Sequence, residues 1–368
     1  MVGEEFARNG LIGGNNMNKR EIIELILSNG NPTQKYIVCR DVLGMDIYSP
    51  DMLNLQEQII QSKQAKKLLK KQNADGWFGK ELHGGEGFDG IINQIKELGI
   101  EAYHPFMQKA KQALLLDLNP SPWFAAGKSE TEPVEAYTYS RAMVLACLYN
   151  NDEHDKLLLR FQDELIEKFA AVKNIESLNE VSKELTTKRF TETKGWKWHP
   201  DLEARIYLKD KVDTFPWVAD IYVLAASLNW KNSQTENIIT EAMIHISSFA
   251  PVPIIYHPGY VRPVGTYEFL DNPFDCPHTQ FLTDGRLNDY YCLCKICDIE
   301  QIAHYYKNVE WLTGHIKNNS LIDNLSNEAL RAIEQSYAYS GKWESEIQKK
   351  TDIYYRVLLI LHYAKVNF

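Results

Sequence analysis

The sequence predicts an all-α fold. Apolar residues recur three or four positions apart along most of the chain, as Ile22, Leu25 and Ile26 do near its start. The apolar/polar alternation typical of strands is scarce, and the only β-like stretch, residues 251–263, carries four prolines that favour an extended loop or an edge. With 368 residues, 44% of them hydrophobic, the chain can bury a sizeable core. Such a pattern predicts roughly a dozen helices arranged in pairs.

The expected helices follow this spacing in chain order, and each window places its apolar residues on one face. They are Lys19–Leu27, Tyr36–Leu43, Met52–Gln72, Phe88–Leu98, Glu101–Leu116, Val134–Tyr149, Lys156–Val172, Leu178–Thr186, Phe215–Leu228, Thr235–Ser248, Leu287–Lys307, Val309–Lys317, Asn327–Tyr337 and Asp352–Tyr363. No low-complexity linker interrupts them, so residues 18–368 are expected to form a single domain. Residues 1–17 are expected to be a flexible extension, with Met17 as an alternative start.

Charge and cysteine content exclude several classes of protein. A formal net charge of -9 argues against binding of nucleic acid through its phosphates. No apolar stretch reaches the ~20 residues that a membrane span requires, and no signal peptide is indicated. Six cysteines in a chain of this length do not form the framework of a secreted protein. We therefore expect a soluble, cytoplasmic protein whose oligomeric state the sequence leaves open.

Tryptophan and glycine recur between the expected helices. The segment from Gln72 to Gly79 contains Gly76 and Trp77, and comparable turns contain Trp123, Gly195-Trp196 and Gly341-Lys-Trp343. Glycine permits the turn, and a tryptophan beyond a helix end can wedge between neighbouring helical hairpins. The spacing is too uneven for a strict solenoid repeat.

The segment from Gln72 to Trp77 resembles the Gln/Trp repeat of terpenoid cyclases and protein prenyltransferase β-subunits. The resemblance implies an α/α toroid of about six helical hairpins, in two concentric rings around a central cavity that holds a small-molecule ligand. The family's catalytic motifs are not evident. The chain has no Asp-x-Asp-Asp run and no Asp-Asp-x-x-Asp site, and Asp289 and Cys292 are three residues apart where the prenyltransferase zinc ligands are two apart. No metal site is predicted, and the cofactor is unknown.

Acidic residues follow several of the turns, at the starts of expected helices. Asp89, Glu135, Asp220, Asp289 and Asp352 would line the mouth of a toroid, where they could meet a ligand. Alternatively they complement the helix dipole, an effect of ~0.3–1 kcal/mol each.

Three of the candidate groups suggest acid–base chemistry. Asp220 lies in an apolar helix and needs either an Arg or Tyr partner or a wet cavity. The loop from Glu81 to Asp89 contains His83, Glu86 and Asp89 among glycines. Two interpretations of this loop remain open, an acid–base site and a surface loop without a catalytic role. The candidate catalytic residues are Asp220, Asp89 and His83.

The candidate ligand-binding residues combine aromatic and polar side chains, a set that suits a sugar or an isoprenoid but also plain hairpin packing. They are Trp77, Glu86, Trp198, His199, Tyr260, Arg262, His278, Asp289 and Tyr290. Cys294-x-x-Cys297 lies within an apolar helix, so packing is favoured over zinc binding.

Three functions remain open. The first is cyclisation or transfer chemistry on an isoprenoid-like or other small ligand. The second is an α/α-barrel glycoside hydrolase or lyase that acts on oligosaccharides. The third is a toroid without catalysis that binds a ligand or a protein.

Overall fold

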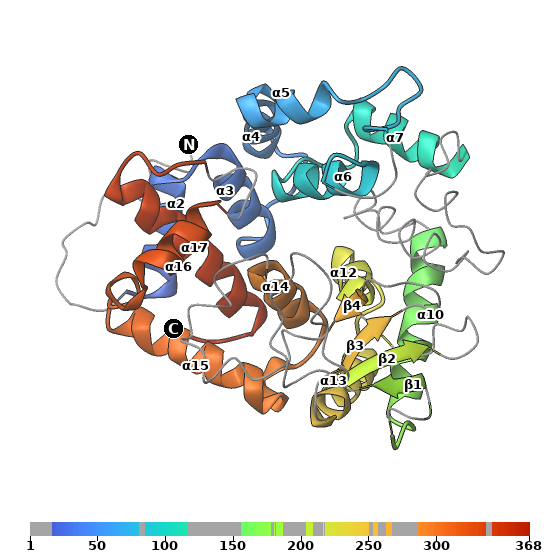
Figure 1. Cartoon of the computed structure of the whole chain (residues 1–368). Coiled ribbons are helices and arrows are strands. Elements are labelled where there is room, and N and C mark those ends of the chain that lie inside the picture. The colour runs from blue at the N-terminus through green and yellow to red at the C-terminus, as the bar shows by residue number, and fades with distance from the viewer. Residues whose placement is uncertain are drawn as a thin grey trace.

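The computed structural model describes residues 17–80, 85–116, 156–177, 180, 182–186, 204–208, 216, 218–249, 253–256, 263–266, 286–335 and 341–368. The expected N-terminal extension and the expected helix over 134–149 lie outside these ranges, apart from Met17. Within them the chain is mostly helical, as predicted (Figure 1).

The helices are short and closely follow the apolar periodicity of the sequence. They are α2 (Lys19–Asn29), α3 (Pro32–Ile37), the π-helix η1 (Val38–Val42), α4 (Pro50–Gln61), α5 (Lys63–Leu69), α6 (Phe88–Glu97), α7 (Pro105–Leu116), α10 (Lys156–Val172), α12 (Val218–Ala226), α13 (Ser233–Ser248), α14 (Arg286–Ile296), η4 (Ile299–Gln301), α15 (Ala303–Lys317), η5 (Ile322–Asn324), α16 (Asn327–Gln335) and α17 (Glu346–Tyr363).

Local capping residues set several helix starts. Asn18 accepts a hydrogen bond from the backbone N–H of Glu21, whose side chain in turn accepts from the N–H of Asn18. Asn31 caps α3 in the same way, with Pro32 at its first position. These reciprocal bonds satisfy backbone donors that a helix start otherwise leaves open.

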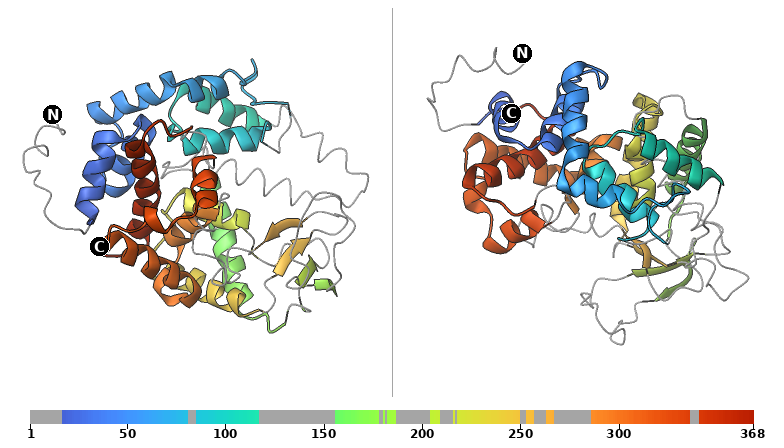
Figure 2. Two further views of the ribbon diagram at one scale, coloured as in Figure 1. Left: turned by 60° about the vertical axis from the view of Figure 1, so that its left-hand side comes forward. Right: turned by 90° about the horizontal axis from the view of Figure 1, so that it is seen from above.

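Helix α17 lies at the centre of the packing. Every residue from Thr351 to Leu361 is buried, and α2, η1, α14 and α15 contact the helix on different sides. The backbone N–H of Lys19 donates to the carbonyl of Phe368 (3.2 Å), so the beginning of α2 lies beside the C-terminus (Figure 2). The buried apolar side chains form one continuous core from Ile22 to Leu361.

A small four-stranded sheet lies on one side of the helices in the described part of the chain (Figure 2). Its strands are β1 (Ser182–Thr186), β2 (Ala204–Leu208), β3 (Pro253–Tyr256) and β4 (Pro263–Thr266), in that order. The pairs β1–β2 and β3–β4 are antiparallel, whereas β2 and β3 run parallel with Arg205 opposite Ile254. Residues 253–256 are extended, as expected for the proline-rich stretch, but β3 pairs with both β2 and β4, so the expectation of a loop or an edge is wrong for these residues. The sheet is an addition to the expected helices.

Some predicted elements differ from the structure. The helix expected over 178–186 is wrong, because residues 182–186 form β1; pairing with β2 overrides the local helical spacing. The long helix expected over 52–72 is two helices, since Ser62 is extended and its side chain caps α5. The helix expected over 287–307 ends at Ile296 and is followed by η4.

Candidate functional site

The turn from Gln72 to Trp77, which carries the resemblance, packs against α6 and α7. The side-chain amide of Gln72 donates to the carbonyls of Gly76 (3.0 Å) and Phe106 (2.7 Å), which ties the turn to the start of α7. Trp77 is fully buried and its ring centroid lies 4.3 Å from that of Phe88 on α6. Trp77, a predicted ligand contact, thus lies in the core between α5 and α6.

The turn between α16 and α17 places its tryptophan differently. Trp343 is partly exposed, and its backbone N–H donates to a carboxylate oxygen of Glu334 (2.8 Å). Its indole Nε1 donates to Asp352 (3.1 Å), which also accepts from Gln34 (3.0 Å) and Arg356 (2.9 Å). The buried polar contacts of Asp352 therefore fix the indole at the N-terminal end of α17.

A hollow of about 640 Å³ opens beside this indole; we call it the Trp343 pocket. It combines one indole and one leucine with two cationic and three acidic side chains, besides an amide and a hydroxyl. The lining residues are Asn327, Leu330, Arg331, Glu334, Trp343, Glu344, Ser345, Glu346 and Lys349. Most small-ligand sites are lined mainly by apolar and aromatic side chains, whereas this hollow has one aromatic wall and a mostly polar and charged lining.

Two of the acidic residues predicted near helix starts are ion-paired within the structure. Asp220 on α12 is fully buried and accepts from the ammonium of Lys168 on α10 (2.7 Å), so its partner is a lysine. Asp352 is paired with Arg356 one turn later, and it lies in the second turn of α17 because that helix begins at Glu346. Asp89 is buried in the first turn of α6.

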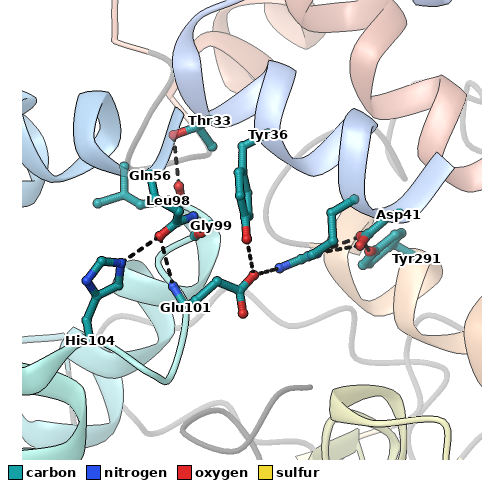
Figure 3. Close-up of polar contacts among 10 residues, drawn as sticks. Thr33, Tyr36, Asp41, Gln56, Leu98, Gly99, Glu101, His104 and Tyr291 are labelled. Atoms are coloured by element: carbon teal, nitrogen blue, oxygen red, sulfur yellow. Dashed lines mark hydrogen bonds and ion pairs between the residues drawn. The ribbon is translucent and has the colours of Figure 1, made fainter. Parts of the chain in front are cut away.

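A buried polar cluster joins α3, η1, the segment after α6, and α14 (Figure 3). Glu101 accepts from the hydroxyl of Tyr36 (2.8 Å) and from the guanidinium of Arg40 (2.6 Å). Arg40 also donates to Asp41 (2.6 Å), which accepts from the hydroxyl of Tyr291 (3.0 Å). We call these five residues the Arg40 cluster.

The segment after α6 brings Glu101 to this cluster. Gly99 has a φ of 76°, and its carbonyl accepts from the side-chain amide of Gln56 (2.6 Å). The oxygen of the same amide accepts from the backbone N–H of Glu101 (3.3 Å) and lies 3.0 Å from Nε2 of His104 (Figure 3). A single side chain on α4 thereby sets the position of the carboxylate.

The Arg40 cluster perturbs its own titratable groups. Burial raises the pKa of Asp41, but the neighbouring Arg40 guanidinium, together with Lys295 and the Tyr291 hydroxyl, outweighs this and lowers the pKa to about 2. Burial, reinforced by the Asp41 charge, raises the pKa values of Tyr291 and Tyr363. Clusters of perturbed groups occur preferentially at functional sites.

One usable sign of this cluster is present in the sequence, although the prediction did not use it. Arg40 and Asp41 are adjacent charges within an otherwise apolar helical stretch, and buried charges need partners. Nothing in the sequence pairs them with Glu101 or with Tyr291, which lies 250 residues beyond Asp41.

Other predicted site residues are dispersed or lie outside the described residues. Glu86 is exposed and pairs with Lys71, and Tyr290 is buried and donates to the carbonyl of Tyr305 (2.6 Å). Asp289 lies in the first turn of α14. The described ranges do not include His83, Trp198, His199, Tyr260, Arg262 and His278.

The cysteines of α14 pack in the core. Cys292 and Cys294 on α14, and Cys297 directly after it, are buried and form no disulfide, and the thiol of Cys297 donates to the carbonyl of Leu293 (3.1 Å). Among the described residues, no three His, Cys, Asp or Glu side chains form a group that could hold a metal ion. Over the same residues, no helix is long and apolar enough to cross a membrane.

Comparison with protein-family models gave no match, and neither did comparison with curated proteins or with solved structures.

Proposed function

We propose that the chain is an α/α-toroid protein similar to terpenoid cyclases and prenyltransferase β-subunits, and that it binds a small ligand in the Trp343 pocket. Two packing features support the toroid. The helices at the two ends of the described chain, α2 and α17, pack against each other, as ring closure requires. A segment with Gly and Trp precedes α6, at Gly76 and Trp77, and another precedes α17, at Gly341 and Trp343.

The Trp343 pocket is the observation that carries the ligand proposal. It lies between α16 and the N-terminal end of α17. The indole that forms one wall is held by Asp352 and needs no rearrangement to present its surface. Binding groups that are fixed in advance lose little conformational entropy when a ligand arrives.

The lining of the pocket favours an oligosaccharide over a prenyl chain. Most of its side chains are polar or charged, with cations and carboxylates of both signs, and these suit hydroxyl groups. An indole can stack on the apolar face of a sugar ring. A prenyl chain would leave the polar groups without partners, which is costly.

Acid-initiated cyclisation has less support. A carboxyl group that protonates an alkene must present its proton to the substrate, whereas Asp220 is buried and accepts from the ammonium of Lys168 (2.7 Å). We therefore place binding of an oligosaccharide before cyclisation of an isoprenoid, with hydrolysis or elimination on the bound sugar as the accompanying chemistry.

A thermal-shift series tests the ligand class on the full chain. Farnesyl diphosphate with Mg²⁺, a neutral trisaccharide series and a uronic trisaccharide series are added separately, because a ligand that binds only the native state raises Tm. We expect a rise with at least one trisaccharide and none with farnesyl diphosphate. A shift with farnesyl diphosphate alone would support the isoprenoid function, and no shift with any of them would refute small-ligand binding of both classes.

A further inference from the structure

Helix α5 carries a row of lysines on the outside of the molecule (Figure 1). From Lys63 to Lys71 the chain has five lysines and no acidic residue, although its net charge is -9. Four of the five recur three or four residues apart, so they share one face of the helix, and all four are exposed. We call Lys63, Lys66, Lys67 and Lys70 the α5 lysine strip.

The stability of the helix does not account for this strip. Its four ammonium groups have no hydrogen-bond or ion-pair partner among the described residues. Lysines near the end of a helix complement the helix dipole, but Lys63 at the first position of α5 does the opposite. Like charges three and four residues apart also repel each other. The row of lysines therefore costs α5 stability and calls for a partner outside the helix.

We propose that the α5 lysine strip is a docking surface for an extended, acidic segment of a partner protein. The strip lies on α5, whereas the Trp343 pocket lies between α16 and α17, so this proposal does not depend on the ligand of that pocket.

The chain's own Glu86 shows which anion this surface accepts. The Glu86 side chain is exposed, yet its carboxylate is held by Lys71, directly after the strip. The hydrogen bond and charge of Lys71, with a smaller contribution from Lys67, lower the pKa of Glu86. A carboxylate at the end of a flexible glutamate side chain is therefore a group that these lysines attract.

The spacing of the strip suits an extended peptide. Along the helix axis Lys63 and Lys70 are about 10.5 Å apart. Alternate side chains of an extended chain point to the same side about 6.7 Å apart, so two or three carboxylates of a Glu-x-Glu-x-Glu segment lie within reach of the strip. The flexible four-carbon stems of the lysines take up the remaining difference.

A broader anionic surface suits the strip less well. The Debye length in physiological salt, about 8 Å, is close to the length of the strip, so an occupant as narrow as a peptide interacts mainly with the lysines. A membrane or a nucleic-acid duplex would also cover the surrounding surface of a chain whose net charge is -9. In addition, Ala65 and Leu68 are buried, so α5 has no apolar face to insert into lipid.

Binding of a labelled acidic peptide to the full chain tests the proposal. A fluorescent dodecapeptide of alternating Glu and Ser is titrated with the protein at low salt, and fluorescence anisotropy gives Kd. The same peptide with Gln in place of Glu is the uncharged control. We expect the acidic peptide to bind with a Kd that rises with salt, and the Gln peptide not to bind at the same concentrations.

Two double variants of equal net charge separate the strip from the charge of the whole chain. Lys63→Gln/Lys67→Gln relieves repulsion along α5 and is expected to fold, and Lys317→Gln/Lys342→Gln removes two exposed lysines elsewhere. Because single exposed ion pairs contribute little, we expect about a fivefold rise of Kd in the first variant and an unchanged Kd in the second.

Three results would overturn the proposal. The first is that the acidic peptide does not bind, and the second is that the two variants weaken its binding equally. The third is that phosphatidylserine vesicles or a uronic hexasaccharide bind more tightly than the peptide and are weakened by the strip variant alone, since the partner would then be a membrane or a polysaccharide.

Discussion

Gly76 provides a sharp test of the Gly/Trp turn. Its φ is 98°, and a Cβ built there would lie 2.5 Å from the carbonyl oxygen and 2.9 Å from Cγ of Lys109 on α7. A left-handed conformation costs an L-residue ~1–2 kcal/mol, and the contact with backbone cannot be relieved by a rotamer change. Gly76→Ala should therefore lower the free energy of unfolding by about 2–4 kcal/mol.

Two other glycines serve as graded controls in the same denaturant-unfolding assay. Gly341 has a φ of 56° but open space around it, so Gly341→Ala should cost only ~1–2 kcal/mol. Gly314 lies inside α15 with open space, and Gly314→Ala should be neutral or stabilise by up to about 1 kcal/mol. Equal effects at the three positions would refute the account of the turn, because backbone conformation and close approach would then not matter.

The remaining predictions concern buried charges. Asp220→Asn should lower the free energy of unfolding in urea by about 3–5 kcal/mol, because it removes the carboxylate that balances the buried ammonium of Lys168. The double variant Asp220→Leu/Lys168→Met should lower it by less than that single change. A larger cost for the double variant would contradict this. The Asp41 carboxyl has a pKa lowered to about 2 in the folded state, so its stabilisation of about 2 kcal/mol is present above pH 4 and is lost as the pH falls towards 2. Between pH 5 and 2, the free energy of unfolding of Asp41→Asn should fall by correspondingly less than that of the unchanged protein. An equal fall in the variant and in the unchanged protein would exclude this stabilising role of Asp41.

Much of the helical fold was readable from local signals. Asn31 before Pro32, and Asn232 three residues before Thr235, are capping signals at helix starts that the structure has, whereas the expected helices began later, at Tyr36 and Thr235. The break at Ser62 and the strand at 182–186 were not predicted. In the strand, hydrogen bonds to the distant residues 204–208 decide the conformation, and periodicity within the segment carries no information about that partner.

The candidate sites were less predictable for the same reason. The Arg40 cluster assembles Glu101 and Tyr291 from segments far apart in the sequence. Trp77 and Trp343 occupy similar turns in the sequence, yet one is fully buried against Phe88 and the other lines a pocket. Only the packing of neighbouring elements distinguishes them.

The affinity of the full chain for the trisaccharide that raises its Tm most, measured by titration calorimetry, tests the central proposal most directly. Arg331 lines the Trp343 pocket, whereas the exposed Arg160 lies on α10, so Arg331→Ala and Arg160→Ala form a matched pair. Loss of a hydrogen bond from a charged group weakens binding by about 1.5–3 kcal/mol, or roughly tenfold to a hundredfold in Kd. We predict that loss for Arg331→Ala and an unchanged Kd for Arg160→Ala. An unchanged Kd in both variants would contradict the placement of the ligand in this pocket.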